Sequence, residues 1–316
     1  MIDVSIIIVN YNTCELTKQC IDSIYDKTSN VDFEIIVVDN DSTDGSKELF
    51  IKDKRIRFIE AGGNIGFGKA NNIGVTAAKG KYVFFLNSDT ILMNNAVKLF
   101  YVYCESHEKD RLGAVGCLLE NVNKEYVHSY GVFPSIWSIP SNLFSAGIRL
   151  MTHKPKKVVG NVIYGEEQVV DYVTGADMFV SKATIDKYGA FDPDFFMYYE
   201  DTEMQKRWHS HGLRNIIIKT PRIVHLEGCS TNSGVKKKLN EKKLYMNMRS
   251  QILYFKKTES FFGYFVFRLV ALMNLLPVIR GKYNFSQFVQ ISKILFSPCN
   301  IHTSSSNASK PTGCLV

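Results

Sequence analysis

Several features that would place this chain in a special class are missing from its sequence. The seven cysteines are odd in number and include no C-x-x-C pair, so we expect no disulfide framework and a reducing compartment. There is no internal repeat. No basic segment with a cleavage site precedes the first apolar run, so we expect no signal peptide. With 45% hydrophobic and 22% charged residues among 316, the composition is that of an ordinary globular protein.

Charge is distributed unevenly along the chain. Residues 230–316 contain thirteen Lys or Arg and two acids, a net charge of +11, whereas the whole chain carries +7. The first 229 residues are therefore mildly acidic, at −4. Because the basic part is also rich in Phe and Leu, we expect it to meet a phospholipid or a lipid pyrophosphate and no nucleic acid.

The first hundred residues alternate between short apolar runs and helical segments. Runs of strand length cover residues 3–9, 33–38, 56–60 and 82–86. Helices are predicted over residues 13–25, 42–50 and 67–78, with Thr13 as the N-cap of the first. This order predicts an α/β fold with a mostly parallel, Rossmann-like sheet flanked by helices.

The remainder of the chain has a less regular pattern. We predict strands over residues 113–119, 169–173, 178–180 and 216–218, and helices over 197–211 and 236–257. Residues 120–168 resist assignment. We divide the chain into a body, a basic and apolar helical region, and a low-complexity disordered tail, with bounds 1–232, 233–300 and 301–316.

Polar side chains follow the first two predicted strands. Asn10 and Tyr11 follow the first, and Asp39 follows the second. In a parallel sheet these strand ends share one rim, which is where open α/β folds bind ligands. There a carboxylate can accept a hydrogen bond from a base N–H, and a tyrosine can stack on the ring. The alternative is plain turn chemistry, with residues 39–42 capping the next helix.

A glycine-rich stretch over residues 62–68 opens the third predicted helix. Its free backbone N–H groups and the positive helix end suit an anion. The stretch follows the third strand instead of the first, and no Walker lysine followed by Ser or Thr is present. It therefore indicates close backbone approach to a ligand without matching either common nucleotide fingerprint.

Asn87-Ser88-Asp89 stands directly after the buried run 82–86. A divalent ion that bridges a diphosphate needs hard oxygen ligands, usually one or two carboxylates together with water. Asp89 is the only carboxylate here, and Asn87 would contact ribose or position a water molecule. The alternative is that Asp89 caps a helix near Leu92.

An acidic cluster, Glu200-Asp201-Thr202-Glu203, follows four aromatic residues and a methionine. A carboxylate sheltered by aromatic rings becomes more basic through desolvation, as a general base for a sugar hydroxyl must be. The alternative is that these acids complement a helix N-terminus, and both roles are compatible. His225 is a lone histidine, and its partnership with Asp89 cannot be derived from spacing.

Five ordered motifs together resemble inverting family 2 glycosyltransferases of the GT-A fold, most closely the rhamnosyltransferase-like branch that builds bacterial surface polysaccharides. The resemblance covers roughly residues 3–232, and its motifs span residues 5–12, 38–45, 64–67, 87–89 and 199–201. It implies a nucleoside-diphosphate sugar donor, a glycan or polyprenyl-linked acceptor, and Mg²⁺ or Mn²⁺ as cofactor. The family's metal motif commonly begins with Asp, and Asn87 stands at that position here.

The resemblance also implies roles for individual residues. Donor-binding roles fall to Asn10, Tyr11, Asp39, Asn64, Gly66, Lys69, Asn87, Ser88, Gly175, Ala176 and Asp177. Asp89 would ligate the metal with the help of His225. Asp201 would be the catalytic base, with Glu200 beside it. The implied function is the transfer of a sugar, such as rhamnose, in cell-surface polysaccharide synthesis.

Residues 261–279 are apolar apart from Arg268 and Asn274, with Pro277 near the end. We favour an interfacial helix that makes a peripheral membrane contact through residues 256–282, over a helix docked on the body. A bilayer-spanning helix ranks third. We therefore expect a cytoplasmic protein on the inner face of the cell membrane. If the segment does not anchor the chain, it belongs to the core or to a homodimer interface.

Two other functions stay open at this point. One is a sugar-nucleotide nucleotidyltransferase, which also uses a parallel α/β sheet. Against it, no Gly-rich signature with Lys or Arg follows the first strand, where Asn10-Tyr11-Asn12 stand. The other is a non-catalytic subunit that retains the GT-A fold.

Overall fold

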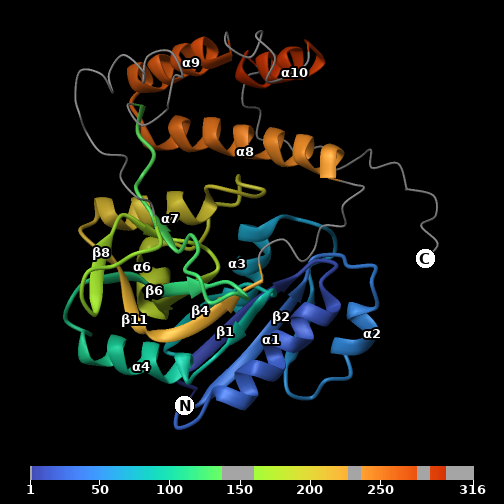
Figure 1. Cartoon of the computed structure of the whole chain (residues 1–316), viewed down its shortest axis with the longest axis vertical. Coiled ribbons are helices and arrows are strands. Elements are labelled where there is room, and N and C mark those ends of the chain that lie inside the picture. The colour runs from blue at the N-terminus through green and yellow to red at the C-terminus, as the bar shows by residue number, and fades with distance from the viewer. Residues whose placement is uncertain (1, 137–159, 227–235, 276–284, 297–316) are drawn as a thin grey trace.

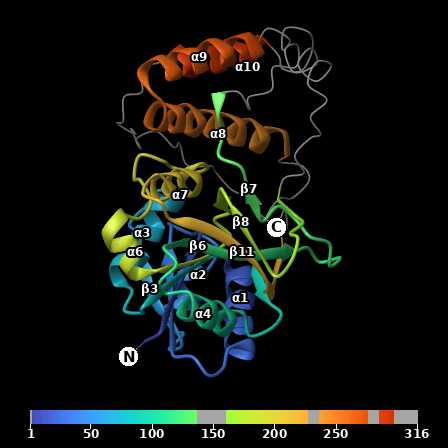
Figure 2. The ribbon, with the colours of Figure 1, turned by 90° about the vertical axis from the view of Figure 1, so that its left-hand side faces the viewer.

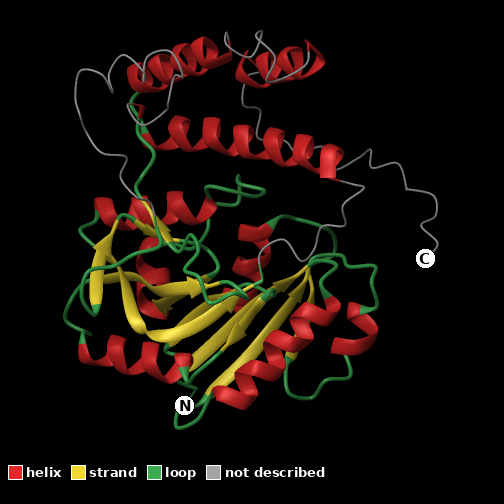
Figure 3. Ribbon diagram, in the orientation of Figure 1, coloured by secondary structure: helices red, strands yellow, loops and turns green. Residues whose placement is uncertain are grey.

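The computed structural model describes residues 2–136, 160–226, 236–275 and 285–296. A twisted sheet lies between two layers of helices, and three further helices form a separate layer above α7 (Figures 1 and 3). The first half contains β1 (Val4–Asn10), α1 (Cys14–Lys27), β2 (Phe33–Asp39), α2 (Ser46–Phe50), β3 (Arg57–Glu60), α3 (Phe67–Ala77), β4 (Tyr82–Leu86), β5 (Thr90–Leu92), α4 (Ala96–Ser106) and β6 (Leu112–Glu120). The second half contains β7 (Tyr130–Gly131), β8 (Glu167–Val170), β9 (Tyr172–Val173), β10 (Asp177–Ser181), α6 (Lys182–Tyr188), α7 (Glu200–Ser210), β11 (Arg214–His225), α8 (Lys236–Thr258), α9 (Phe261–Leu275) and α10 (Phe285–Phe296).

The main sheet of the described chain runs in the order β3-β2-β1-β4-β10-β6-β11-β5, and β8 also pairs with β11. Strands β1 to β4 pair in parallel, as their alternation with helices predicted. Strand β10 enters antiparallel between β4 and β6, which makes the sheet mixed. The predicted α/β fold with a helix-flanked, mostly parallel sheet is confirmed.

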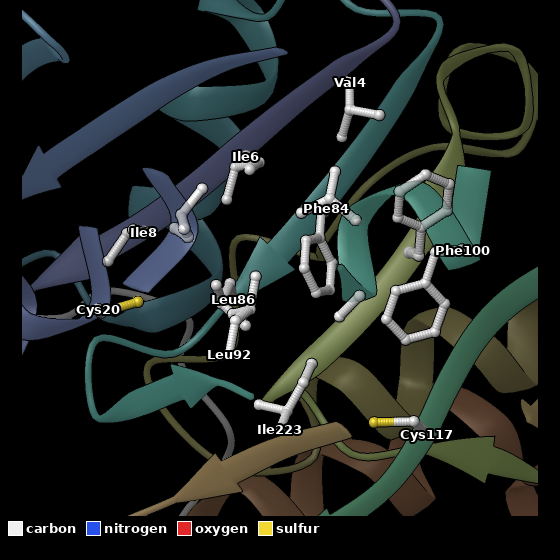
Figure 4. Close-up of a cluster of buried hydrophobic side chains, with 14 of the residues drawn as sticks. Val4, Ile6, Ile8, Cys20, Phe84, Leu86, Leu92, Phe100, Cys117 and Ile223 are labelled. Atoms are coloured by element: carbon white, nitrogen blue, oxygen red, sulfur yellow. The ribbon is translucent and has the colours of Figure 1, made fainter. Parts of the chain in front are cut away.

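Alternate residues of the central strands supply the cores on the two faces of the sheet. Ile6 and Ile8 of β1 point to the face covered by α1, α2 and α4, whereas Ile7 points to the face covered by α3, α6 and α7. All three side chains are fully buried, as a strand covered by helices on both faces requires. Figure 4 shows Phe84 and Phe100 in the cluster on the first face, together with Ile6 and Ile8.

Three predicted boundaries are wrong because local polar or strained groups interrupt the apolar pattern. The helix expected from residue 42 begins at Ser46, because Asp44 accepts hydrogen bonds from the Ser46 backbone N–H and hydroxyl group. The helix expected from residue 197 begins at Glu200, because Tyr198 and Tyr199 have φ values of +70° and +67°. The strand expected over residues 169–173 is broken at Asp171 into β8 and β9.

Strand β11 is much longer than its prediction over residues 216–218. It continues to His225 and pairs with β6, with a register shift between Ile218 and Ile223. Pro221 lies inside this shift, where the absence of its N–H costs no ladder hydrogen bond. The sequence-based reading ended the strand at the polar residues before Pro221, and so missed the part that reaches the rim.

Helices α8, α9 and α10 pack on one another and lie on the same side of the molecule as α7 in both views (Figures 1 and 2). Their shared cluster includes Phe255, Phe267 and Ile291, and it also takes in Phe195 from the loop before α7. The predicted basic helix over residues 236–257 is confirmed. The region is therefore docked on the body through α8.

Two expectations fall wholly or partly outside the described residues. The boundary between residues 232 and 233 and the tail at 301–316 both lie there, so the division into three parts stays a prediction. Within the described part of the chain, no helix combines the length and apolarity that a bilayer crossing requires.

Phe100 tests the packing of this core. Its ring lies 5.3 Å from that of Phe84 and 5.5 Å from that of Phe179, and the residue is fully buried. We expect Phe100→Ala to lower the free energy of unfolding by about 3–5 kcal/mol, measured by urea denaturation. The control is Val102→Ala, two residues along α4 and 49% exposed, which we expect to cost less than about 1 kcal/mol. Equal losses in the two variants would contradict the described packing.

Candidate active site

The carboxyl ends of β1 and β2 are joined by their own side chains. Asn10 and Asp39 are register partners, and the Asn10 amide donates to Asp39 Oδ1 at 2.6 Å. Asp39 Oδ2 accepts from the Ser42 backbone N–H at 3.0 Å, so these residues do form a turn, but residues 39–42 do not cap helix α2, which begins at Ser46. Asn10 is fully buried and Asp39 is 4% exposed, whereas Tyr11 is 48% exposed. The parallel register of β1 and β2 thus places the buried Asn10 amide beneath the Asp39 carboxylate at the rim.

The glycine-rich stretch is tied to this rim by Asn40. The Asn40 side chain donates to Asn64 Oδ1 at 3.0 Å and accepts from the Ile65 backbone N–H at 2.9 Å. Sequence reasoning missed Asn40, although its place in a run of polar residues after β2 was a signal. Helix α3 begins directly after Gly66, and the half-buried Lys69 lies in its first turn. The predicted donor-binding residues Asn64 and Gly66 therefore lie beside Asp39, which precedes Asn40 at the end of β2.

Gly66 is required by the close approach of another loop. Its φ is +92°, and a Cβ atom there would lie 2.3 Å from the Phe196 carbonyl oxygen. The same carbonyl accepts a hydrogen bond from the Phe67 N–H at 2.9 Å. The loop before α7 is thus held against the start of α3, which brings the acidic cluster next to the glycine-rich stretch.

Asn87, Ser88 and Asp89 leave β4 on the same rim. Ser88 Oγ accepts a hydrogen bond from the Thr13 hydroxyl at 3.0 Å, and the Asn87 N–H donates to the Ala176 carbonyl at 3.0 Å. Thr13 precedes α1 as predicted, but its hydroxyl binds these loop groups and does not cap the helix. The alternative that Asp89 caps a helix near Leu92 is wrong, because residues 90–92 form strand β5.

Strand pairing in the sheet brings His225 next to Asp89. It is the last residue of β11, and antiparallel pairing of β11 with β5 sets it opposite Thr90. Its Nε2 lies 3.2 Å from Asp89 Oδ1, and the two side chains are 11% and 24% exposed. The pairing explains how residues 136 positions apart come into contact, which spacing alone could not show.

Asp201 lies in the first turn of α7 and meets the strip between β9 and β10. Its Oδ2 accepts from the Gly175 N–H at 2.8 Å, and its Oδ1 accepts from the Thr202 N–H at 2.6 Å. Gln205, one turn along and fully buried, accepts from the Val173 N–H and donates to the Val173 carbonyl. Sequence reasoning missed Gln205, whose only signal was its spacing of four from Asp201.

Glu200 and Asp201 form a carboxyl pair with unusual acidity. Burial, together with the neighbouring Asp201 charge, raises the pKa of Glu200 from 4.5 to about 8. Burial also raises the pKa of Asp201, against the hydrogen bonds from Gly175 and Thr202. Glu200 is 5% exposed, and its Oε2 has no hydrogen-bond partner among the residues that the structure describes. The pair therefore favours holding one negative charge near neutral pH, at the positive end of α7.

Asp177 is placed deeper than its neighbours. It is fully buried, and its Oδ2 accepts from the Cys117 N–H at 2.7 Å. Burial raises its pKa to about 7. Gly175 is partly accessible and Ala176 is 4% exposed, so the strip at 175–177 descends from the rim into the core.

A continuous set of contacts thus joins the predicted residues. From Asp39 it passes through Asn10 and Thr13 to Ser88, and from Asn87 through Ala176 and Gly175 to Asp201. Among the residues that the structure describes, no group of three or more His, Cys, Asp or Glu forms a ready metal cluster. Within the described part of the chain, Asp89 and His225 therefore offer two protein ligands, a number that suits an ion completed by phosphate oxygens and water.

The raised pKa of Glu200 makes folding stability depend on pH. Between pH 4.5 and about 8 the folded chain binds a proton that the unfolded chain has lost, so stability falls as pH rises through this range. We expect the urea midpoint of the wild-type chain to fall from pH 5 to pH 8, and Glu200→Gln to remove much of that fall. Exposed Glu48→Gln serves as the control. Parallel pH profiles for wild type and Glu200→Gln would contradict the assignment.

Comparison with known proteins fits this geometry. The profile of Glycosyl transferase family 2 matches residues 5–143, which include Asn10, Asp39 and Asp89. Rhamnosyltransferase WbbL of Escherichia coli K12 is 28% identical over 231 residues, covering 70% of this chain and 83% of that protein. An uncharacterized glycosyltransferase of Rickettsia bellii is 36% identical over 143 residues, or 42% of this chain. The match spans only 20% of the Rickettsia protein's own length.

Comparison with solved structures identifies the fold. A structure of GalNAc-T7 with UDP, GalNAc and Mn²⁺ superimposes with a TM-score of 0.58 at 15% identity. The superposition covers 81% of this chain and 48% of that chain. The sheet and its flanking helices therefore have the GT-A fold. Residues 5–143 of this chain match the Glycosyl transferase family 2 model.

Proposed function

We propose that the chain is an inverting glycosyltransferase that moves a sugar from a nucleoside diphosphate to a hydroxyl group. The observation that carries this proposal is the single rim on which a series of hydrogen bonds between neighbouring residues connects the segments that carry Asp39, Asp89 and Asp201. One acid lies where a nucleoside would bind, one beside a histidine, and one on the start of a helix beside the glycine-rich stretch. Those are the positions that donor, counter-ion and acceptor need.

The donor would lie along the ends of β1, β2 and β4. Asp39 has one accepted hydrogen bond on each oxygen, which leaves a lone pair on each for a pyrimidine N3–H. Tyr11 is exposed enough to stack on the base. Asn10 and Asp177 are buried, so we assign them to support beneath the donor and not to contact with it. Residues Asn64, Gly66, Lys69, Asn87, Ser88, Gly175 and Ala176 would line the ribose, the diphosphate and the sugar.

The donor set at Asp89 and His225 fits a divalent cation. A carboxylate oxygen and an imidazole nitrogen face each other at 3.2 Å, and both are partly accessible. Mn²⁺ accepts this mixed pair readily, and Mg²⁺ binds through one or two carboxylates with phosphate oxygens and water. When bound, such an ion would neutralise charge on the departing diphosphate. Asn87 contributes no charge, so Asp89 would be the carboxylate ligand that residues 87–89 supply.

Asp201 is suited to take the acceptor proton. In the single displacement, the acceptor oxygen attacks the anomeric carbon and its proton passes to Asp201. The bond from that carbon to the diphosphate oxygen breaks, and its electron pair leaves with the nucleoside diphosphate. One attack inverts the configuration. Glu200, protonated near neutral pH, would leave the negative charge of the pair on Asp201.

The sugar and the acceptor are proposed from the relatives. Residues of this chain align with 83% of a protein described as a rhamnosyltransferase, and the motifs resemble that branch. We therefore propose a hexosyl or rhamnosyl donor, and a glycan or polyprenyl-linked acceptor in cell-surface polysaccharide synthesis. We propose that the protein acts at the inner face of the cell membrane, where such acceptors meet nucleotide sugars.

One assay separates this proposal from its two alternatives. The chain is incubated with Mn²⁺ and a panel of nucleotide sugars, with and without glycan acceptors, and free nucleoside diphosphate is measured. A glycosyltransferase gives release that increases with acceptor. A nucleotidyltransferase gives exchange of pyrophosphate, and a non-catalytic subunit gives neither.

Asp201→Asn tests the base in the same assay. The amide keeps the shape of the side chain but cannot take a proton, so we expect at least about a 100-fold loss of turnover. Nucleoside diphosphate binding, followed by thermal shift, should stay close to that of the wild type. The matched control is Asp186→Asn on α6, which lies away from the rim and pairs with Lys182. Wild-type turnover in Asp201→Asn would overturn the base assignment.

We also propose that α9 is the peripheral membrane contact. Four of its apolar side chains are exposed: Phe261 (90%), Phe262 (74%), Phe265 (52%) and Leu269 (46%). Phe267 of the same helix is 1% exposed and packs in the α8–α10 cluster, so the helix is docked and still presents an apolar face. Lys257, expected to flank this contact, instead binds Asp192 and Asp194 of the body.

The membrane contact is tested by replacing Phe261, Phe262 and Phe265 together with Ser. Each phenyl group contributes on the order of 1 kcal/mol or more when it leaves water, so partitioning should fall at least about tenfold. The measurement is flotation with phosphatidylglycerol vesicles, with exposed Val102→Ser as the control. Unchanged flotation would contradict the proposal. A wild-type dimer that the triple substitution dissociates would assign the face to contact between two copies.

A further inference from the structure

The loop before the acidic pair is held in an unfavourable backbone conformation. Tyr198 and Tyr199 have φ values of +70° and +67°, a region that residues with a Cβ atom rarely occupy. Such geometry is energetically unfavourable and persists only where the surroundings impose it. Tyr199 is also the residue from which α7 starts, so its conformation decides where Glu200 and Asp201 point.

Helix α8 contacts both strained tyrosines. Lys243 Nζ lies 5.9 Å from the centre of the Tyr198 ring. Gln251 donates to the Tyr199 hydroxyl at 3.0 Å, and the Tyr254 ring lies 5.4 Å from the Tyr199 ring. The strained residues are therefore fixed from one side by a single helix.

The same helix holds the rest of the loop. Lys257 Nζ binds Asp192 at 2.7 Å and Asp194 at 2.6 Å, and Ser250 donates to the Met197 carbonyl at 2.6 Å. Phe195, between them, is fully buried in the cluster formed with α8. Polar contacts thus act at both ends of the loop, with an apolar anchor in the middle.

The other side of the loop meets the proposed donor site. The Phe196 carbonyl accepts from the Phe67 N–H at the start of α3, and Gly66 packs against it. The loop is therefore enclosed between α8 and the glycine-rich stretch, and movement of α8 would be transmitted to both the proposed base and the proposed diphosphate site.

We propose that Gln251 and Lys257 of α8 are positioning residues, which set the loop at residues 192–199 and through it the orientation of Asp201. The C-terminal helices then help, through α8, to orient the proposed catalytic base, in addition to forming the proposed membrane contact. This inference rests on the proposed function for its kinetic consequence, but the conformational part can be measured without turnover.

The test compares Gln251→Ala and Lys257→Met with wild type in the full chain. Hydrogen exchange should become faster in peptides covering residues 192–203 and stay unchanged in β1 and β2. With the nucleotide sugar that supports turnover, kcat should fall about tenfold or more at a nearly unchanged KM for the donor, because misplacing a reacting group slows the reaction without weakening binding elsewhere. Lys257→Arg should restore both readouts.

Lys242→Met is the matched control, since Lys242 is an exposed lysine on the same helix and has no assigned role. Unchanged exchange at residues 192–203 in both test variants would overturn the inference. Faster exchange with unchanged kcat would also overturn it. If the wild-type chain releases no nucleoside diphosphate from any donor, the proposed function fails, and the exchange measurement alone decides whether α8 holds the loop.

Discussion

The register between β1, β2 and β4 is the constraint on which the rest of the site depends. Because Asn10 lies opposite Asp39 and the three strands run in parallel, the side chains that follow them reach one rim. The buried Asn10 amide then fixes Asp39 from below, and Thr13 extends the network to Ser88. A shift of one residue in any pairing would turn these groups to the opposite faces of the sheet and dissolve the network.

Much of this arrangement could be predicted from the sequence because it follows from local periodicity. Apolar runs separated by helical segments imply a parallel sheet, and strand ends in such a sheet share a rim, so Asn10, Asp39 and Asp89 could be grouped in advance. The helix that carries Asp201 could be recognised too, but its start could not. The hydrophobic pattern does not reveal that Tyr198 and Tyr199 both have a left-handed backbone conformation, because that conformation is imposed by α8 and α3.

The contact between Asp89 and His225 could not be predicted from local sequence patterns. It depends on an antiparallel pairing of β5 with the last residues of β11, which lie beyond Pro221 and a register shift. A proline in a strand usually marks its end, so the continuation is a product of tertiary packing that no local signal encodes. The docking of α8 on the body has the same character. Its contacts with residues 192–199 join segments about fifty positions apart. In the sequence, the α8 side chains that make these contacts look like those of an ordinary basic helix.

Two cavities in the described part of the chain lie at the other ends of the strands. One of them, of about 350 Å³, is lined by the basic residues Lys81, Arg111 and Lys187 together with Glu108, and its cations offer an alternative place for an anion. The most direct test is therefore a crystal structure with a nucleoside diphosphate and Mn²⁺. We expect an anomalous manganese peak at Asp89 and His225, with the base beside Tyr11 and Asp39. A nucleotide bound in the cavity beside Lys81 and Arg111, with no metal at Asp89, would overturn the proposed donor site.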